Sequence, residues 1–395
     1  MPSWLDTPRL PSAPEPGEPA PDLRAYPLLA PLAACPQDPV HHGEGDVLAH
    51  TQLVCAALAD DPEWRALDRR DREVLWLAAV LHDAGKPQTT REEDGRLRAP
   101  GHARAGAILA RRLLWQAGMG WRTREAVCGL VRWHMALYHL LDRPDPVRQA
   151  LALSLEAGRP DLLRLLVLAD ARGRVARDTE ERLEVVELAY AHLDELGCGH
   201  GPYPFASDHA RFTYFLGAGT ADRDPAYPAF DDTLTTLTLL SGLPGAGKDR
   251  WIAEHAGADT GDADAEIISL DALRAERGAK RTDRTAQGQI VQEARGRLRT
   301  ALAAGRPVVW NTTGLSRQLR GPLAQLAHDY RARVRIVCLE TPPATLRAQN
   351  AGRADRDRVP EAAIERMLAK WEFPALDECH ERVVVEQVPA RTAGG

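Results

Sequence analysis

The residues with the clearest chemical meaning form a glycine-rich stretch in the second half of the chain. Residues 241–249 read Ser-Gly-Leu-Pro-Gly-Ala-Gly-Lys-Asp and follow an apolar run, 234–240. They fit most of the phosphate-loop pattern G-x-x-x-x-G-K-[ST], in which backbone N–H groups surround phosphate oxygens and the lysine reaches the outer phosphates. The stretch predicts a site for ATP, or another nucleoside triphosphate, with Mg²⁺. The residues expected to form it are Gly242, Pro244, Gly245, Ala246, Gly247, Lys248 and Asp249.

Two residues depart from the usual chemistry of such a site. Asp249 stands where a Ser or Thr hydroxyl normally holds Mg²⁺. Asn311, at the end of a later apolar run, stands where an acid normally helps to hold the ion. Because the carboxylate missing at one position is found at the other, we expect Asp249 to take over part of the metal binding. The alternatives are an acid favoured only by the helix dipole, or a site that has lost activity.

An acid and an arginine follow the next predicted strand. Asp271 directly follows the segment 266–270 and precedes Arg274 by three residues, so both face one side of a first helical turn. Beside a phosphate loop, this pair could act on the acceptor of the phosphate. The alternative is an Asp271 that only caps the helix N-terminus.

Histidines and aspartates recur at helix positions in the first half of the chain. Imidazole and carboxylate groups suit divalent transition metals, and an adjacent His-Asp pair lets one carboxylate bridge two ions. A carboxylate that follows the apolar segment 166–169 also needs a partner, because burying it alone is costly. The candidate ligands are His50, His82, Asp83, His102, His134 and Asp170. His41 and His42 lie upstream and could approach this site or simply fill a turn.

Lysine is rare in this chain, and two of the lysines lie in candidate sites. The chain has 46 arginines and four lysines, so arginine serves wherever any cation will do. Lys86 and Lys248 nevertheless lie within the two candidate sites, where a planar guanidinium does not replace a compact ammonium.

The spacing of apolar residues divides the chain into two halves. Residues 47–196 show three- and four-residue periodicity without hairpin signals, which predicts an all-α unit. Short apolar runs then alternate with amphipathic stretches, which predicts an α/β unit with a parallel sheet. The expected strands are 234–240, 266–270, 307–310, 334–339 and 383–386. The expected domains are a Pro-rich, flexible lead-in (1–40), a helical domain (41–200), an aromatic and Pro-rich joint (201–233) and an α/β domain (234–395).

Composition excludes some classes of protein. No apolar run approaches the ~18 residues of a membrane span, and the N-terminus lacks the apolar core of a signal peptide. Six cysteines lie far apart without a C-x-x-C pair, which indicates reduced thiols and a cytoplasmic location. The net charge of −6 does not indicate a nucleic-acid partner. The basic stretch 277–299 is either a solvated helix face or a track for a phosphate backbone.

The helical half resembles the HD phosphohydrolase superfamily, whose members carry His, His-Asp and a late Asp in that order. The resemblance assigns His50, His82, Asp83 and Asp170 as metal ligands. His102 and His134 match the extra ligands of the two-metal members. It implies one or two divalent ions (Mn, Co, Ni, Fe or Zn), a bridging Asp83, and Lys86 as a phosphate contact.

The α/β half resembles the polynucleotide 5′-kinase family. The resemblance makes Asp271 the general base for a 5′-hydroxyl and Arg274 a contact to the acceptor's phosphate. The segment 346–360, rich in arginine, resembles the lid that closes over ATP phosphates. Spacing alone does not decide between Arg353 and Arg356 as the catalytic lid arginine, and a solvated charged loop is the alternative.

The order of the two halves resembles the HD-Pnk family of bifunctional nucleic-acid end-healing enzymes. It implies removal of 2′,3′-cyclic or 3′-terminal phosphate, phosphorylation of 5′-hydroxyl ends, RNA or DNA ends as substrate, and a nucleic-acid ligase acting downstream. A nucleotidase joined to a nucleoside kinase is the main alternative. A nucleotide-binding regulatory protein with a degenerate kinase and a stand-alone RNA-binding module are the others.

Overall fold

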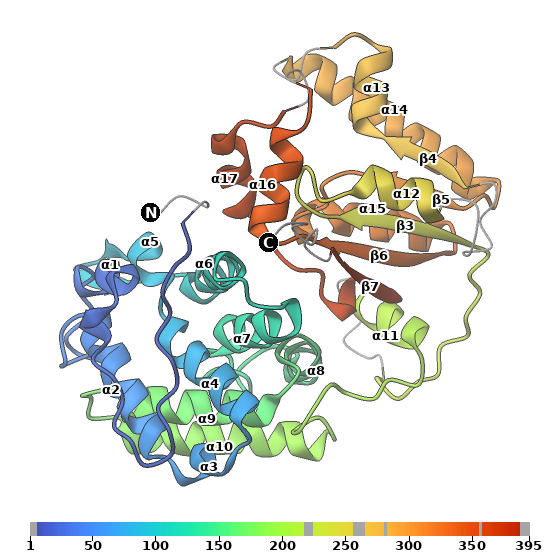
Figure 1. Cartoon of the computed structure of the whole chain (residues 1–395). Coiled ribbons are helices and arrows are strands. Elements are labelled where there is room, and N and C mark those ends of the chain that lie inside the picture. Colours follow the sequence, from blue (N-terminus) through green and yellow to red (C-terminus); the bar gives the residue numbers. More distant parts are fainter. Residues whose placement is uncertain (1–5, 217–223, 256–264, 280–282, 355–357, 388–395) are drawn as a thin grey trace. The chain divides into compact units, whose positions relative to one another are not determined.

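The computed structural model describes residues 6–216, 224–255, 265–279, 283–354 and 358–387 (Figure 1). The chain forms two compact units, Met1–Pro204 and Phe205–Gly395. Each unit is described by itself. None of the helices in the described ranges is long and apolar enough to cross a membrane.

The first unit is built from helices. Its longer helices are α2 (Val47–Asp60), α4 (Arg69–Leu81), α6 (His102–Gln116), α7 (Trp121–Trp133), α8 (Pro146–Ala157), α9 (Pro160–Arg172) and α10 (Thr179–Glu195). Shorter elements are η1 (Leu23–Ala25), η2 (Pro27–Leu29), α1 (Ala30–Ala33), α3 (Pro62–Ala66) and α5 (Lys86–Thr89). Aspartates begin four of these helices: the side chains of Asp46, Asp61, Asp68 and Asp145 each accept a hydrogen bond from a first-turn N–H.

The helical fold class of this unit is confirmed, and α8 begins after Asp145, which precedes Pro146 and is a helix-start signal. One local feature was not expected from the sequence. It is a hairpin of β1 (Arg91–Glu93) and β2 (Arg96–Arg98). Its turn residues Asp94 and Gly95 both have positive φ, 54° and 73°, as a two-residue type I′ turn requires.

The Pro-rich lead-in packs instead of remaining flexible. Leu23, Leu29 and Leu32 are buried. The Trp76 indole donates a hydrogen bond to the Pro11 carbonyl (3.2 Å), and the Leu23 N–H donates to Gln52 Oε1 (2.8 Å). A proline-rich segment loses little backbone freedom on docking, so a few buried leucines suffice to hold it.

The second unit is an α/β fold, as predicted. Five parallel strands lie in the order β4-β5-β3-β6-β7. They are β3 (Thr235–Ser241), β4 (Glu266–Ser269), β5 (Val308–Asn311), β6 (Ala332–Glu340) and β7 (Glu381–Glu386). The remaining elements are α11 (Asp208–Phe215), α12 (Lys248–His255), α13 (Leu270–Glu276), α14 (Arg284–Ala303), α15 (Arg317–Asp329), α16 (Pro343–Ala351), α17 (Glu361–Leu368) and η3 (Leu376–Glu378).

The central strands place the candidate nucleotide site. β3 pairs with β5 on one side and β6 on the other, and the chain leaves its carboxyl end directly into the phosphate loop and α12. Strands β4 and β5 end at the same edge of the sheet. Ligands of open α/β sheets bind at this edge, where the strand order reverses. Part of the aromatic joint belongs to this fold, because Phe212 of α11 is fully buried in its core.

Candidate functional site

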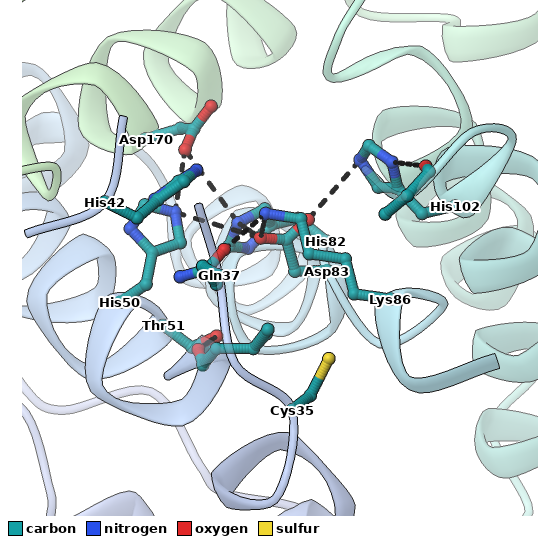
Figure 2. A network of polar contacts seen from close by, with 12 residues as sticks. Cys35, Gln37, His42, His50, Thr51, His82, Asp83, Lys86, His102 and Asp170 are labelled. Atoms are coloured by element: carbon teal, nitrogen blue, oxygen red, sulfur yellow. Dashed lines mark hydrogen bonds and ion pairs between the residues drawn. The ribbon is translucent and has the colours of Figure 1, made fainter. Parts of the chain in front are cut away.

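All six predicted metal ligands come together in the first unit, and Figure 2 labels all of them except His134. They come from five segments: His50 from α2, His82 and Asp83 from the turn after α4, His102 from the start of α6, His134 from the end of α7, and Asp170 from α9. Five of the six are buried, and the His102 side chain is 12% exposed. His102 is therefore the most exposed of the six candidate ligands.

The carboxylate of Asp83 lies between two sets of ligands. Its Oδ2 atom is 3.2 Å from His82 Nε2 and 3.9 Å from His50 Nε2. Its Oδ1 atom is 3.4 Å from His102 Nε2 and 3.8 Å from His134 Nε2. Asp170 completes the first set, since its Oδ1 atom is 2.9 Å from His50 Nε2. One carboxylate that faces two sets of imidazoles is the arrangement that bridges two ions.

Three of the histidines are oriented in the same way. Each ring Nδ1 lies within hydrogen-bond distance of the backbone carbonyl three residues earlier: His82 to Ala79 (2.7 Å), His102 to Ala99 (2.8 Å) and His134 to Val131 (2.8 Å). A carbonyl only accepts, so each Nδ1 carries the proton and each Nε2 keeps its lone pair. Such a second contact is what fixes a metal-ligating histidine.

The Nε2 atoms show that a cation fits between them. His82 Nε2 is buried and has no hydrogen-bond partner among the described residues. His102 Nε2 and His134 Nε2 face each other at 3.1 Å, although the tautomers above put a lone pair on both. Two facing lone pairs repel unless a positive charge lies beside them. The residues present therefore fit divalent ions on either side of Asp83.

The protonation states suit ligation. Burial lowers the pKa of His134 to about 3 and also lowers that of His102, so both rings are neutral. Burial opposes the charge of Asp83, but Lys86 and His82 hold its pKa well below the usual range. Burial likewise opposes the charge of Asp170, and Arg174 and His50 keep its pKa low. His50 differs: burial opposes its charge, but Asp170 and Glu44 raise its pKa, so an ion there would have to displace the proton on Nε2. Neutral imidazoles and ionised carboxylates are the forms that bind metals.

A turn glycine sets the distance between α4 and α6. A Cβ atom on Gly85 would overlap the backbone of His102 and Gly106 in α6. Its φ is −81°, so glycine is needed here for close approach and not for an unusual backbone conformation. The contact brings the start of α6, and with it His102, next to Asp83.

Basic side chains lie beside the carboxylates. Lys86 Nζ is 2.7 Å from Asp83 Oδ2 and also donates to Gln37 Oε1 (2.6 Å). Arg174 pairs with Asp170 Oδ2 (3.2 Å), which also accepts a hydrogen bond from Tyr138 (3.0 Å). Lys86 thus lies beside the cluster, and its role as a phosphate contact stays a prediction.

Sequence reasoning missed several of these partners. Gln37, Tyr138 and Arg174 carry no motif. Glu44 was also missed, and its carboxylate lies between the rings of His42 and His50. His42 was considered as a residue that could approach the site, and it is buried beside His50, with ring centroids 4.9 Å apart.

The phosphate loop of the second unit borders a cavity of about 770 Å³. Gly245 and Gly247 have φ of 86° and 82°, which only glycine adopts readily and which turns the loop backbone inward. Lys248 Nζ donates to the carbonyls of Gly242 and Leu243 at 3.0 Å each. Burial lowers the pKa of Lys248 to about 8. The predicted residues Pro244, Gly245, Gly247, Lys248 and Asp249 line the cavity, and Gly242 and Ala246 lie within the loop.

The two residues that depart from the phosphate-loop pattern touch each other. The Asn311 amide Nδ2 donates to Asp249 Oδ1 at 2.7 Å, and both residues line the cavity. Donation from Nδ2 leaves Asn311 Oδ1 and Asp249 Oδ2 as oxygens able to face an ion. Asp249 thus supplies an acid where a hydroxyl is usual, and Asn311 supplies an amide where an acid is usual.

Asp271 and Arg274 also line the cavity, where they form an ion pair with each other. Arg274 additionally donates to Gln287 of α14 (2.9 Å). The cap of α13 is Ser269, whose hydroxyl accepts from Ala272 N–H, so the capping alternative for Asp271 was wrong. The Asp271 side chain is 68% exposed.

The lid is described in part. Arg353 lines the cavity beside Val359 and Met367. Arg356 lies outside the described residues.

The basic stretch 277–299 is partly neutralised. Arg277 and Arg297 both pair with Glu293, at 2.5 and 2.7 Å. Within the described part of this stretch, Arg295 is half-buried and Arg299 is exposed. These pairs favour a solvated helix face over a continuous track for a phosphate backbone.

Fold and sites together define an HD domain followed by a P-loop kinase-like domain. Residues 48–174 match the family model of the HD domain, and residues 237–374 match that of an AAA domain. The two matches cover the metal-ligand cluster and the phosphate loop, respectively.

Two curated proteins are similar to parts of the chain. The Multifunctional CCA protein of Halorhodospira halophila is 34% identical over 163 residues, which are 40% of this chain and 37% of that protein. The CC-adding tRNA nucleotidyltransferase of Thermus thermophilus is 43% identical over 108 residues, 27% of this chain and 23% of that protein. The chain thus spans less than two fifths of the length of these relatives.

Two solved structures are also similar. A sugar kinase from Janibacter is 20% identical with a TM-score of 0.29, over 38% of this chain and 85% of that one. A gluconokinase from Sinorhizobium meliloti is 19% identical with a TM-score of 0.28, over 39% and 83%.

Proposed function

We propose that this protein heals broken nucleic-acid ends with two separate sites. The HD domain removes a 2′,3′-cyclic or 3′-terminal phosphate, and the kinase-like domain phosphorylates a 5′-hydroxyl with a nucleoside triphosphate and Mg²⁺. The observation that carries the proposal is the presence, in one chain, of a bridging Asp83 between two imidazole sets and of a phosphate loop opposite Asp271. The tRNA named for one relative supports a nucleic-acid substrate.

In the HD domain, His50, His82 and Asp170 would hold one divalent ion and His102 and His134 the other, with Asp83 between them. Bound ions would supply an activated water and polarise the phosphoryl oxygens. Lys86 lies where its ammonium can exchange Asp83 for a phosphate oxygen of the substrate. Arg174 and Tyr138 keep Asp170 ionised and fixed in direction.

In the kinase-like domain, Asp271 accepts the proton of the attacking hydroxyl, and Arg274 binds the adjacent phosphate of the acceptor. Lys248 leaves the carbonyls of Gly242 and Leu243 to reach the outer phosphates of the nucleotide. Arg353 stabilises the charge that develops on the transferring phosphoryl group. The cavity joins these residues in one space.

A second candidate function is a nucleotidase joined to a nucleoside kinase. The pairing of Arg277 and Arg297 with Glu293 favours it, because a nucleic-acid track would need those charges. Both candidates use the same catalytic residues and differ in the size of the acceptor.

One set of substrates tests both candidates. End-healing predicts transfer of labelled γ-phosphate from ATP to a 5′-hydroxyl oligonucleotide with Mg²⁺, and loss of 3′-phosphate or 2′,3′-cyclic phosphate with Mn²⁺, Co²⁺ or Ni²⁺. Four imidazoles among six ligands favour these ions over Mg²⁺ in the HD domain. Activity on nucleosides and mononucleotides alone would replace the first proposal by the second.

A further inference from the structure

We infer that Glu44 is a positioning residue for the metal centre, acting through His50. The inference rests on the proposed metal-dependent function of the HD domain. His50 differs from the other three histidines, because its Nδ1 atom does not face a backbone carbonyl of its own helix. Glu44 Oε1 lies 2.9 Å from it instead. A carboxylate therefore lies beside Nδ1 of His50 at the position that main-chain carbonyls take beside Nδ1 of His82, His102 and His134.

Glu44 is itself held firmly. Its side chain is 3% exposed. Its Oε2 atom accepts a hydrogen bond from the Val175 N–H (3.0 Å), and the neighbouring Gly43 N–H donates to the Val175 carbonyl (3.0 Å). These bonds tie the loop before α2 to the segment that follows α9. The Glu44 carboxylate is thus held by the segment that follows α9, the helix that supplies Asp170.

The contact determines which atom of His50 faces the centre. The ring places Nδ1 2.9 Å from Glu44 Oε1, and its Nε2 lies 2.9 Å from Asp170 Oδ1 and 3.9 Å from Asp83 Oδ2. A carboxylate behind an imidazole fixes the tautomer and strengthens the ring as a ligand. Loss of Glu44 would leave a fully buried ring free to rotate or to exchange its proton between nitrogens.

Glu44 also contacts a second ring, and the two contacts can be separated. His42 Nδ1 lies 2.8 Å from the same Oε1 atom. Among the described residues, Glu44 supplies the carboxylate that lies within 4 Å of the His42 ring. The carboxylates of Asp83 and Asp170 lie farther from this ring. Removal of the His42 ring therefore tests whether Glu44 acts through His42 or through His50.

The test measures binding of Mn²⁺ to the full-length, metal-free protein by calorimetry. Glu44→Gln keeps the size of the side chain but leaves one acceptor oxygen. In the wild type, Oε1 faces the two histidine rings and Oε2 accepts from the Val175 N–H. We expect it to weaken one class of site by about 10–100-fold, as for other partners of metal ligands. The sites for the second ion, which use His102 and His134, should keep their affinity. His42→Ala should bind Mn²⁺ as the wild type does.

Glu125→Gln is the matched control. Glu125 is another carboxylate of the same unit, with a side chain 14% exposed, but Arg111 and Arg124 hold it (2.7 Å each). The Glu125→Gln variant should have a lower melting temperature than the wild type in the metal-free state but the same affinity for Mn²⁺. Wild-type affinity in Glu44→Gln, or an equal loss in His42→Ala or Glu125→Gln, would overturn the role of Glu44. A wild-type protein that binds no Mn²⁺ would instead overturn the metal centre of the proposed function, and this inference with it.

Discussion

Asp249 in α12 and Asn311 at the end of β5 both depart from the usual phosphate-loop chemistry, and they contact each other. Asp249 follows the phosphate-loop lysine, Asn311 ends β5, and a hydrogen bond of 2.7 Å joins them. Each residue alone breaks a rule of the motif. Together they keep one carboxylate and one neutral oxygen beside the expected place of the ion. The site therefore has the usual charge, but the carboxylate stands at the hydroxyl position and the neutral group at the acid position.

We expect Asp249→Ala to lower the kinase kcat by about 10–100-fold, because it removes a group that positions Mg²⁺. Asp249→Ser should recover part of this loss, and Asp249→Ser with Asn311→Asp should recover more. The measurement is a double-mutant cycle on kcat with Mg²⁺ and ATP. Coupling above about 0.5 kcal/mol would show that the two residues share the ion, whereas strict additivity would leave Asp249 as an acid favoured by the helix dipole.

Lys248 predicts how nucleotide binding depends on pH. Burial lowers its pKa to about 8 in the nucleotide-free protein, below its ordinary value, so the folded protein favours the uncharged amine. Phosphate oxygens favour the charged form. Nucleotide affinity should therefore be constant below the lowered pKa and fall as the pH rises through about 8, by up to about tenfold per pH unit.

The measurement is a titration with a nonhydrolysable ATP analogue from about pH 7 to about pH 9, where other lysines stay charged. Lys248→Arg is the comparison, because a guanidinium remains protonated throughout and should flatten the profile. The same decline in both proteins would assign the pH dependence to another group.

At the scale of elements, a single missing Cβ lets α6 approach the turn after α4. Gly85 permits this contact, and His102, the first residue of α6, gains its place beside Asp83 from it. The two ligands that face Asp83 Oδ1, His102 and His134, lie next to each other. The second set of ligands therefore depends on how closely two helices pack.

We expect Gly85→Ala to displace α6 and to remove the sites for the second ion, with the first set of ligands retained. Bound metal, measured by elemental analysis after dialysis, should fall from two ions to one. Gly120→Ala is the control, since Gly120 precedes α7 and a Cβ there meets nothing within 4 Å. Two ions in Gly85→Ala would show that the helices can adjust.

The sequence predicts most of the elements, and it picks out six candidate ligands that the fold brings together, because both depend on short-range patterns. The expected strand 266–270 is β4 at Glu266–Ser269, and 334–339 lies within β6. Glu44 escapes such reasoning, because its conformation is set by hydrogen bonds to Val175, 131 residues away. The hairpin was missed for a different reason: its Asp94-Gly95 signal is present but the flanking strands are only three residues long.

For the whole molecule, the two sites belong to different compact units and share no residue. The metal-ligand cluster lies within Met1–Pro204, and the residues around the phosphate loop lie within Phe205–Gly395. Each unit has its own buried core, and the core of the second includes residues of β3 to β6 and of α11, α13, α14 and α15. Damage to one site should therefore leave the chemistry of the other intact.

We expect Asp83→Ala to abolish phosphohydrolase activity and to leave 5′-kinase activity near that of the wild type. Lys248→Ala should do the reverse, because the ammonium that reaches the outer phosphates is lost while the imidazoles around Asp83 are untouched. Both activities are measured on the same preparation of each variant, with circular dichroism to verify folding. A folded variant that loses both activities would show that the reactions depend on one another, and that the chain acts as a single catalytic unit instead of two domains in series.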